Sequence, residues 1–381
     1  MASQLPFIDL QAQRRRLGDR IDEAVQRVLA HGRFVMGPEI EELEQSLCAY
    51  IGATHGVACA NGTDALQLPL MAWGIGPGDA VFCPAFTFAS TAEVIALMGA
   101  TPVLVDVLPD TFNIDPDDLN AAIEKTKSEG ALKPRAIIAV DLFGLTADYP
   151  TLRAIADRYN LKLIADSAQG FGATLDGKHA LHWADVETTS FFPAKPLGCY
   201  GDGGAMFTND DDLASLLTSL RNHGIGEDRY DNVHIGLNSR LDTIQAAILN
   251  EKFAIFPDEI VLRNQVADRY SAHLQDVVKT PVVPDGYVSV WAQYTICASD
   301  RDGLRAALSD AGAPTAVYYP RSLHQQGAYA KCPIAPSGLA VSVELSKCVL
   351  SLPMHPYLGT DDQDRIISVI QQFGQTRRAA E

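Results

Sequence analysis

A single lysine inside a glycine-rich segment is the first sign of chemistry in this chain. Lys195 follows an apolar run, Val186–Phe192, that predicts a short strand, and the glycines after it predict turns before a second strand at Ala205–Thr208. We expect a lysine in this place to be short of solvent, which favours its neutral amine. A neutral lysine forms a Schiff base with an aldehyde, and pyridoxal phosphate (PLP) is the obvious aldehyde. The competing interpretation is a surface lysine in a turn.

Residues that could hold the phosphate of PLP follow another predicted strand. The strand predicted at 55–62 ends in Gly62 and is followed by Thr63 and Asp64, which can cap a helix. The N–H groups at the start of such a helix bind phosphate. Ser190, which precedes Lys195 on the same segment, could donate a further hydrogen bond. An ordinary helix cap and a solvent-facing serine are the alternatives.

Three residues could contact the ring of PLP, each at the end of a predicted strand. Asp166 ends an apolar strand, where an unpaired carboxylate would be costly and a protonated pyridine nitrogen would be a suitable partner. Gln169 could reach the ring hydroxyl, and Phe86 could cover the ring face. A structural salt bridge and a core phenylalanine are the alternatives. The order of these residues along the chain favours a Schiff-base role for Lys195.

Alternating strands and helices must position these residues. No β-hairpin signal interrupts the alternation, so an α/β fold with a mainly parallel sheet flanked by helices is predicted. Ligands of such sheets bind outside the carboxyl ends of the strands. The strands before Lys195 are predicted at 55–62, 80–84, 101–107, 135–144, 161–168 and 186–192.

Length and texture predict two domains in the 381 residues. We expect a large PLP-binding domain over residues 1–255 and a smaller C-terminal α/β domain over residues 256–381. The smaller domain is expected to contain strands at 288–298 and 314–320 and a last helix from about Thr360. In the large domain, further helices are expected over 16–31, with one apolar face formed by Leu17, Ile21, Val25 and Leu29, and over 86–98.

Composition excludes several classes of protein. With 47 acidic and 30 basic residues, the net charge is −17 and no basic stripe is visible, which argues against nucleic acid or an anionic membrane as partner. The seven cysteines are scattered without a CxxC pair, so no disulfide framework and no metal site is expected. No stretch approaches the roughly 20 apolar residues of a membrane span. A cytoplasmic protein is expected.

At these residues the sequence resembles the DegT/StrS family of nucleotide-sugar aminotransferases, which are fold-type I PLP enzymes. The resemblance spans nearly the whole chain in the expected order. The matching segments are FIDLQAQ (7–13), GRFVMGPEIEELE (32–44), CANGTDAL (59–66), PAFTFASTAE (84–93), DSAQGFG (166–172), SFFPAKPLGCYGDGGA (190–205), GLNSRLDTIQAAIL (236–249), YYPRSLH (318–324) and LPMHP (352–356).

The resemblance implies a role for each ring-binding residue. Lys195 would form the internal aldimine and carry the proton between Cα of the amino acid and C4′ of the cofactor. Asp166 would pair with the pyridinium nitrogen, Gln169 would contact the 3′ oxygen and Phe86 would cover the ring. The dehydratase branch of the family has histidine where this chain has Lys195, so the lysine favours transamination.

The resemblance also implies how the phosphate is held. Gly62, Thr63 and Ser190 would bind it, and Asn238 resembles an asparagine that reaches the phosphate of the neighbouring subunit. The active site would then need a homodimer. The family's usual acidic residue before the aspartate is Ala165 here, from which we expect no functional consequence.

Within the family, the chain looks most like enzymes that aminate C3 of UDP-2-acetamido-2-deoxy-3-keto-D-glucuronate with L-glutamate. That substrate carries a carboxylate, which Arg33 or Arg240 could bind bidentately. Tyr318, Tyr319 and His324 resemble loop positions near the sugar. A salt bridge at the start of a helix explains Arg240 equally well, and packing explains the other three residues.

The resemblance implies a ping-pong reaction, in which glutamate first donates its amino group to the cofactor and the ketosugar then takes it. Three alternatives stay open at this point. The acceptor could be a nucleotide-linked 4-keto-6-deoxy sugar. The chain could be a lyase of the same fold, or a PLP-binding sensor without turnover.

Overall fold

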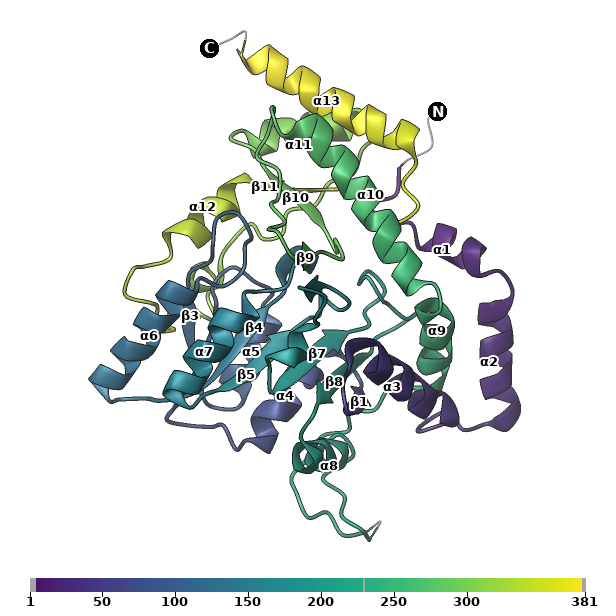
Figure 1. The fold of residues 1–381 in the computed structure, drawn as a ribbon, viewed down its shortest axis with the longest axis vertical. Helices are drawn as coiled ribbons and strands as arrows, with labels where there is room; N and C mark the ends of the chain where they lie inside the picture. The colour runs from purple at the N-terminus through teal and green to yellow at the C-terminus, as the bar shows by residue number, and fades with distance from the viewer. Residues whose placement is uncertain (1–4, 229, 379–381) are drawn as a thin grey trace.

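A seven-stranded sheet forms the centre of the molecule (Figure 1). The computed structural model describes residues 5–228 and 230–378. The strands lie in the order β1-β8-β7-β5-β4-β2-β3, and β8 runs antiparallel to both of its neighbours, whereas the others share one direction. Each strand overlaps one predicted from the sequence, and the α/β fold is confirmed. The strands are β1 (His55–Cys59), β2 (Asp79–Pro84), β3 (Thr101–Val105), β4 (Lys133–Val140), β5 (Lys162–Asp166), β7 (Val186–Ser190) and β8 (Gly204–Thr208).

Helices cover both faces of this sheet because its central strands are apolar on both sides. Phe82 of β2 packs toward α6 and α7, whereas its neighbours Val81 and Cys83 pack toward α4 and α5. This alternation follows from the two-residue period of a strand. The helices of the first 255 residues are α1 (Leu10–Leu17), α2 (Arg20–His31), α3 (Pro38–Ile51), α4 (Gly62–Ala72), α5 (Ser90–Leu97), α6 (Pro116–Glu129), α7 (Tyr149–Tyr159), α8 (Asp211–Leu220) and α9 (Thr243–Phe253).

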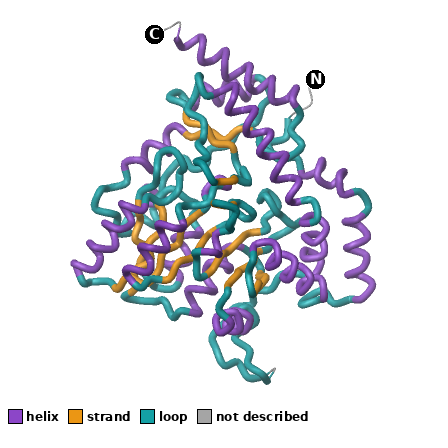
Figure 2. The backbone as a smooth tube through the Cα atoms, viewed as in Figure 1, coloured by secondary structure: helices purple, strands orange, loops and turns teal. Residues whose placement is uncertain are grey.

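Much of the C-terminal part gathers at one end of the molecule, around the long helix α10 (Phe256–Leu274) (Figure 2), whereas residues 323–339 pack beside β3 of the large sheet. The antiparallel pair β10 (Tyr294–Cys297) and β11 (Val349–Leu352) packs with α10, α11 (Arg301–Asp310) and α13 (Thr360–Arg378) in an apolar cluster of its own. The predicted domain boundary falls where α10 begins. The first turn of α10 also packs in the cluster beneath β8, so the division at 255/256 stays a prediction.

Some predicted elements differ from the structure. Residues 314–320 form no strand but a loop with one bridge, Ala316 to Ser351, because a single pairing does not make a ladder. The segment predicted as a strand at 288–298 contains β10 and the end of β9 (Tyr287–Val288), which pairs with β6 (Thr174–Leu175). Between them the chain leaves the extended conformation at Trp291, whose φ is 47°.

Two predicted helices begin or continue differently. The helix expected from residue 86 starts at Ser90, because Ala85 still donates to the carbonyl of Val105 on the neighbouring strand. The helix expected over 16–31 is interrupted at Gly18, whose φ of 58° ends α1. Leu29 is exposed, so the apolar face of α2 is shorter than predicted.

The remaining short segments are α12 (Ala340–Cys348) and three single turns of 3₁₀ helix at Leu142–Gly144, Ala180–His182 and Leu323–Gln325. Among the described residues, no helix combines the length and the apolar character that crossing a bilayer requires.

Candidate active site

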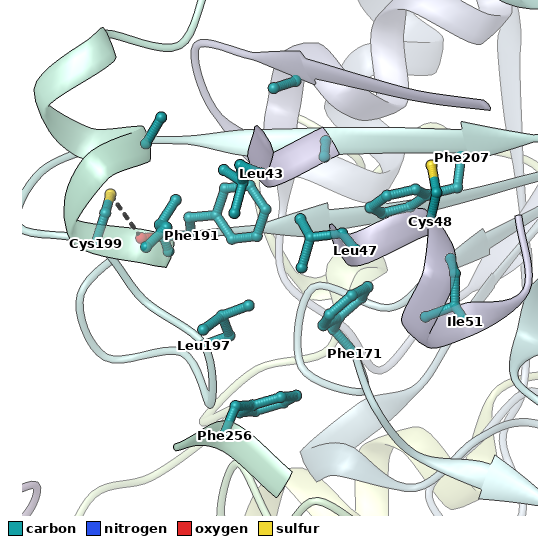
Figure 3. Packing of buried hydrophobic residues seen from close by; sticks show 14 of the residues in the cluster. Leu43, Leu47, Cys48, Ile51, Phe171, Phe191, Leu197, Cys199, Phe207 and Phe256 are labelled. Atoms are coloured by element: carbon teal, nitrogen blue, oxygen red, sulfur yellow. Dashed lines mark hydrogen bonds between the residues drawn. The ribbon is translucent and has the colours of Figure 1, made fainter. Parts of the chain in front are cut away.

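The loop that carries Lys195 is fixed by apolar anchors on both sides of the lysine. It joins β7 to the antiparallel β8, and Phe191, Leu197 and Cys199 are buried in one cluster with residues of α3 (Figure 3). Both the N–H and the Sγ of Cys199 donate to the carbonyl of Phe191, at 2.8 and 3.1 Å. Lys195 itself is half-buried and lies between these anchors. The predicted glycine-rich turn therefore holds the backbone of Lys195 in place from both sides.

Asp166 and Lys195 influence each other electrostatically at the carboxyl edge of the sheet. Asp166 is the last residue of β5 and is buried; it accepts hydrogen bonds from the N–H of Ala168 at 3.2 Å and from Oγ1 of Thr91 at 3.3 Å. Burial raises the pKa of Asp166, and its backbone hydrogen bond and Lys195 oppose that rise. Burial lowers the pKa of Lys195 against the opposing effect of Asp166. A lowered pKa makes a lysine amine a better nucleophile.

Gln169, Phe86 and Tyr319 come together beside this pair. The side chain of Gln169 accepts from the N–H of Phe143 at 2.7 Å and donates to the Oη of Tyr319 at 3.2 Å. The ring of Tyr319 meets that of the fully buried Phe86 edge to face, with centroids 6.0 Å apart. A residue predicted for the sugar thus contacts two residues predicted for the cofactor. Thr91 was missed, because nothing in its spacing shows that α5 faces Asp166.

The start of α4, where a phosphate site is predicted, lies beside Ser190. The first N–H groups of a helix, here those of Gly62 and Thr63, have no partner inside the helix. A Cβ added to Gly62 would lie 2.7 Å from the Cβ of Ser190, so the glycine allows close contact with β7. The helix cap is Asn61, whose side chain accepts from the N–H of Asp64 at 2.8 Å. The predicted phosphate contact of Asp64 therefore cannot use that N–H group and stays untested.

Two further predicted substrate residues lie on the loop that covers Phe86. The N–H of Leu323 donates to the carbonyl of Ala85 at 2.8 Å, which docks this loop at the end of β2. The ring of Tyr318 is half-buried, 5.9 Å from that of Tyr319. His324 is half-buried and its Nδ1 is hydrogen-bonded to Oγ of Ser322 at 2.8 Å, and burial lowers its pKa.

The last three predicted residues, Asn238, Arg240 and Arg33, lie on two other segments, one of which comes close to the start of α4, because Oγ of Ser239 accepts from the N–H of Ala60 at 3.2 Å. Arg240 donates to the side chain of Asn222 at 3.2 Å, and among the described residues it forms none of the ion pairs that were weighed for it. Arg33 is exposed and donates to the carbonyl of Met36 at 3.1 Å. The side chain of Asn238 is exposed as well. The segments that carry these residues are adjacent, because Val35 forms a β-bridge with Asp242.

The arrangement as a whole fits PLP. A lysine and a buried carboxylate occur at one edge, with an aromatic ring beside them and a helix N-terminus nearby to hold phosphate. The family model of the DegT/DnrJ/EryC1/StrS aminotransferases matches residues 15–371 of this chain. The chain belongs to the DegT/DnrJ/EryC1/StrS aminotransferase family.

Individual relatives agree over almost the whole length of the chain. The UDP-2-acetamido-2-deoxy-3-oxo-D-glucuronate aminotransferase of Pseudomonas aeruginosa is 48% identical over 93% of this chain and 96% of its own. A DegT DnrJ EryC1 StrS aminotransferase from Brucella abortus is 56% identical and covers 97% of this chain and 99% of its own, with a TM-score of 0.96. NtdA from Bacillus subtilis, solved with bound cofactor PMP, is 30% identical over 98% of this chain and 86% of its own, with a TM-score of 0.85.

The predicted enzyme class and cofactor are therefore confirmed: this is a PLP-dependent aminotransferase. That result discards the lyase and the non-catalytic sensor that the residues alone left open. The roles of the individual site residues stay predictions, and the two variants below test them.

Gly62→Ala should weaken cofactor binding without unfolding the protein. The added methyl would meet Ser190 at 2.7 Å and force the start of α4 and Ser190 apart, so that they could not both bind the phosphate. Loss of one hydrogen bond to a charged group is worth about 1.5–3 kcal/mol, so the cofactor Kd should rise by about 10-fold or more. Titration of the apoenzyme with PLP, followed by absorbance, measures it. Gly327→Ala is the matched control, because its Cβ would have no neighbour within 4 Å and should leave the Kd unchanged. Equal affinities of the two variants would contradict the phosphate site.

Lys195→Arg should keep the positive charge beside Asp166 and lose turnover. Guanidinium does not give up its proton in proteins, so it can neither attack an aldehyde nor shuttle a proton. Loss of proton transfer alone should lower kcat by about 10²–10⁴-fold. Steady-state transamination measures it, and full activity in the variant would show that Lys195 is not the catalytic lysine.

Proposed function

We propose that this aminotransferase transfers the amino group of L-glutamate to C3 of UDP-2-acetamido-2-deoxy-3-keto-D-glucuronate, in the cytoplasmic synthesis of an amino sugar for surface polysaccharide. The observation that supports this substrate is the 48% identity, over 93% of the chain, to the Pseudomonas aeruginosa enzyme named for it. Amination at C4 of a nucleotide-linked 4-keto-6-deoxy sugar is the alternative that the experiment below tests.

The residues at the edge of the sheet would divide the work of the reaction. When bound, PLP supplies an aldehyde that condenses with amino groups and a ring that withdraws electrons from the adjacent carbon. Lys195 would move the proton between Cα of the amino acid and C4′ of the cofactor, since its lowered pKa suits an amine that is alternately base and acid. Asp166 would keep the ring nitrogen protonated, and Gln169 would orient the ring through its oxygen.

The neighbouring residues would bind and orient the cofactor. Phe86 is fully buried and lies where a ring could stack on it. Gly62, Thr63 and Ser190 would bind the phosphate at the start of α4, where the helix dipole favours an anion. We do not assign Asp64 to the phosphate, because its N–H group already donates to Asn61 and its carboxylate has no proton to donate.

The substrate carboxylate would be bound by Arg240 or Arg33. The guanidinium of Arg240 has five N–H donors, and the contact with Asn222 uses only part of them. A free pair of donors matches the two oxygens of a carboxylate, and a sugar without a carboxylate would gain nothing from it. Tyr318, Tyr319 and His324 would line the sugar side of the site, because their loop docks beside Phe86.

The active site would be completed by a second copy of the chain. Asn238 is exposed, and the loop between α8 and α9 projects from the body of the molecule (Figure 1). Ile235 and Val233 on this loop are 92% and 54% exposed, which a surface covered by a partner would explain. In a homodimer with twofold symmetry, Asn238 of each chain would reach the phosphate of the other.

A half-reaction with one ketosugar at a time tests the substrate. Glutamate should convert the yellow enzyme to its amino form, with loss of the visible absorbance, and release 2-oxoglutarate. After removal of glutamate, the UDP-linked 3-keto-uronate should restore the absorbance. Recovery only with a 4-keto-6-deoxy sugar would overturn the proposed acceptor, and failure of glutamate to bleach the enzyme would overturn the proposed donor.

Subunit mixing tests whether the site is shared. Asn238→Ala and Lys195→Arg should each be impaired alone. If Asn238 serves the partner's site, a mixed dimer of the two variants has one intact site, and an equal mixture should recover about a quarter of wild-type activity. Activity at limiting PLP is measured before and after exchange of subunits. No recovery, with exchange verified by mass spectrometry, would show that Asn238 acts within its own chain.

A further inference from the structure

Two more carboxyl groups are buried directly behind Asp166. Asp141 follows β4 and is 0% exposed, and Glu187 in β7 is 1% exposed. Among the described residues, neither forms an ion pair with a lysine, arginine or histidine; the salt bridges of the structure all involve other carboxylates. Two neighbouring carboxylates, both ionised and both unpaired in the interior, would be very costly.

The hydroxyl of Ser167 lies between the two groups. Its Oγ donates to Oδ2 of Asp141 at 2.7 Å, and it also lies close enough to the carboxyl group of Glu187 to lower the pKa of that group. Oδ1 of Asp141 accepts from the Oη of Tyr149 at 2.7 Å and from a backbone N–H at 3.0 Å. Glu187 accepts from the N–H of Leu181 at 2.9 Å. Asp141 therefore has three hydrogen-bond donors, whereas Glu187 has one, the N–H of Leu181.

The number of donor protons available to Asp141 and Glu187 limits how many of the two carboxyl groups can be ionised. A serine hydroxyl has one proton to donate, so it cannot donate to two carboxylates at once. If Glu187 carries a proton, its own O–H donates to Ser167, whose hydroxyl donates to Asp141. Every polar atom of the chain Glu187–Ser167–Asp141–Tyr149 then has a partner of the right kind. Asp141, with the most donors, is the member that best bears the negative charge.

We propose that Glu187 and Asp141 share one proton across Ser167, with Glu187 neutral and Asp141 anionic, and that this buried pair positions the turn 166–170 and places one negative charge behind Asp166. The chain Glu187–Ser167–Asp141 thus acts on the cofactor only through Asp166 and Gln169. The effect on PLP rests on the proposed roles of those two residues, whereas the shared proton does not.

The turn and the segment after β4 are locked together by several contacts. The N–H of Asp141 donates to the carbonyl of Asp166 at 3.0 Å, and the N–H of Phe143 holds the side chain of Gln169. A Cβ on Gly170 would lie 2.3 Å from the Cβ of Asp141, so only glycine permits this approach. A change in the charge of Asp141 would therefore alter the electrostatic surroundings of Asp166 and the position of Gln169.

The surroundings of the pair agree with one shared proton. Burial raises the pKa of Asp141 to about 7, and burial together with the charge of Asp141 raises that of Glu187 to about 8. The titratable groups that face Asp141 are Asp166 and Tyr149, with Tyr287 farther away; Tyr149 and Asp141 also face Glu187. Burial and the nearby carboxylates raise the pKa of Tyr149, so it stays a neutral donor.

Infrared spectroscopy of the apoprotein tests the proton directly. The difference spectrum between wild type and Glu187→Gln near neutral pH should contain the C=O stretch of one protonated carboxyl. Glu44→Gln is the matched control, because Glu44 is paired with Arg221 at 2.6 Å and should contribute a carboxylate band only. A carboxylate band alone from Glu187 would overturn the proposal.

Thermal unfolding gives a second readout that needs no cofactor. Glu187 binds its proton more tightly when folded, so wild type should lose stability as pH rises from about 5 to about 9, through its raised pKa. The amide of Glu187→Gln can donate to Ser167 at every pH, so the melting temperature of this variant should fall less over that range. Parallel melting curves for the two proteins would contradict the shared proton.

The absorbance of the bound cofactor tests the charge on Asp141. Asp141→Asn removes the negative charge behind Asp166 and should lower the pH midpoint of the visible absorbance by about half a unit to one unit. Glu187→Gln, which removes no charge, should leave the midpoint in place. Equal midpoints in all three proteins would overturn the role in charge. A chain that binds no PLP would instead overturn the proposed function, while the infrared and melting results still decide the shared proton.

Discussion

The attraction between a buried carboxylate and a half-buried lysine is the constraint on which the rest of the site depends. Asp166 and Lys195 each lose hydration, and burial shifts each pKa toward the neutral form. Such groups are tolerated in the interior when each has a partner of opposite charge. In the proposed roles, Asp166 would hold a protonated ring nitrogen of PLP and Lys195 would become the neutral amine, so the charge of each residue would be compensated by the group it binds.

The topology of the sheet explains how Asp166 and Lys195 come to the same edge. β5 and β7 are parallel neighbours, so Asp166 and Ser190 end at the same edge. β8 then returns antiparallel, which forces the intervening loop, with Lys195, to fold over that edge. The loop forms neither a helix nor a strand, so its position is fixed by the buried side chains of Phe191, Leu197 and Cys199.

Most of the fold and the centre of the site could be predicted from the sequence, because both depend on local patterns. Apolar runs identify the strands, and the residue that follows each run lies at the carboxyl edge, which is how Asp166 and Phe86 were found. The strand predicted at 314–320 is wrong because the segment pairs with another strand at Ala316 only. Whether a strand forms depends on its neighbours, which a single-chain pattern does not contain.

The residues that were missed are those whose meaning depends on long-range contacts. Asp141, Ser167 and Glu187 come from three different segments, and nothing in their spacing shows that one hydroxyl lies beside two buried carboxyl groups. Ala165 shows the same limit: it is paired in register with Glu187, so an acidic side chain stands beside it on the neighbouring strand. From the sequence alone, alanine at position 165 had no visible consequence. In the sheet, Glu187 is the residue opposite Ala165 on the neighbouring strand and supplies a carboxyl group there. The charge behind Asp166 is thus a property of adjacent strands and not of either strand alone.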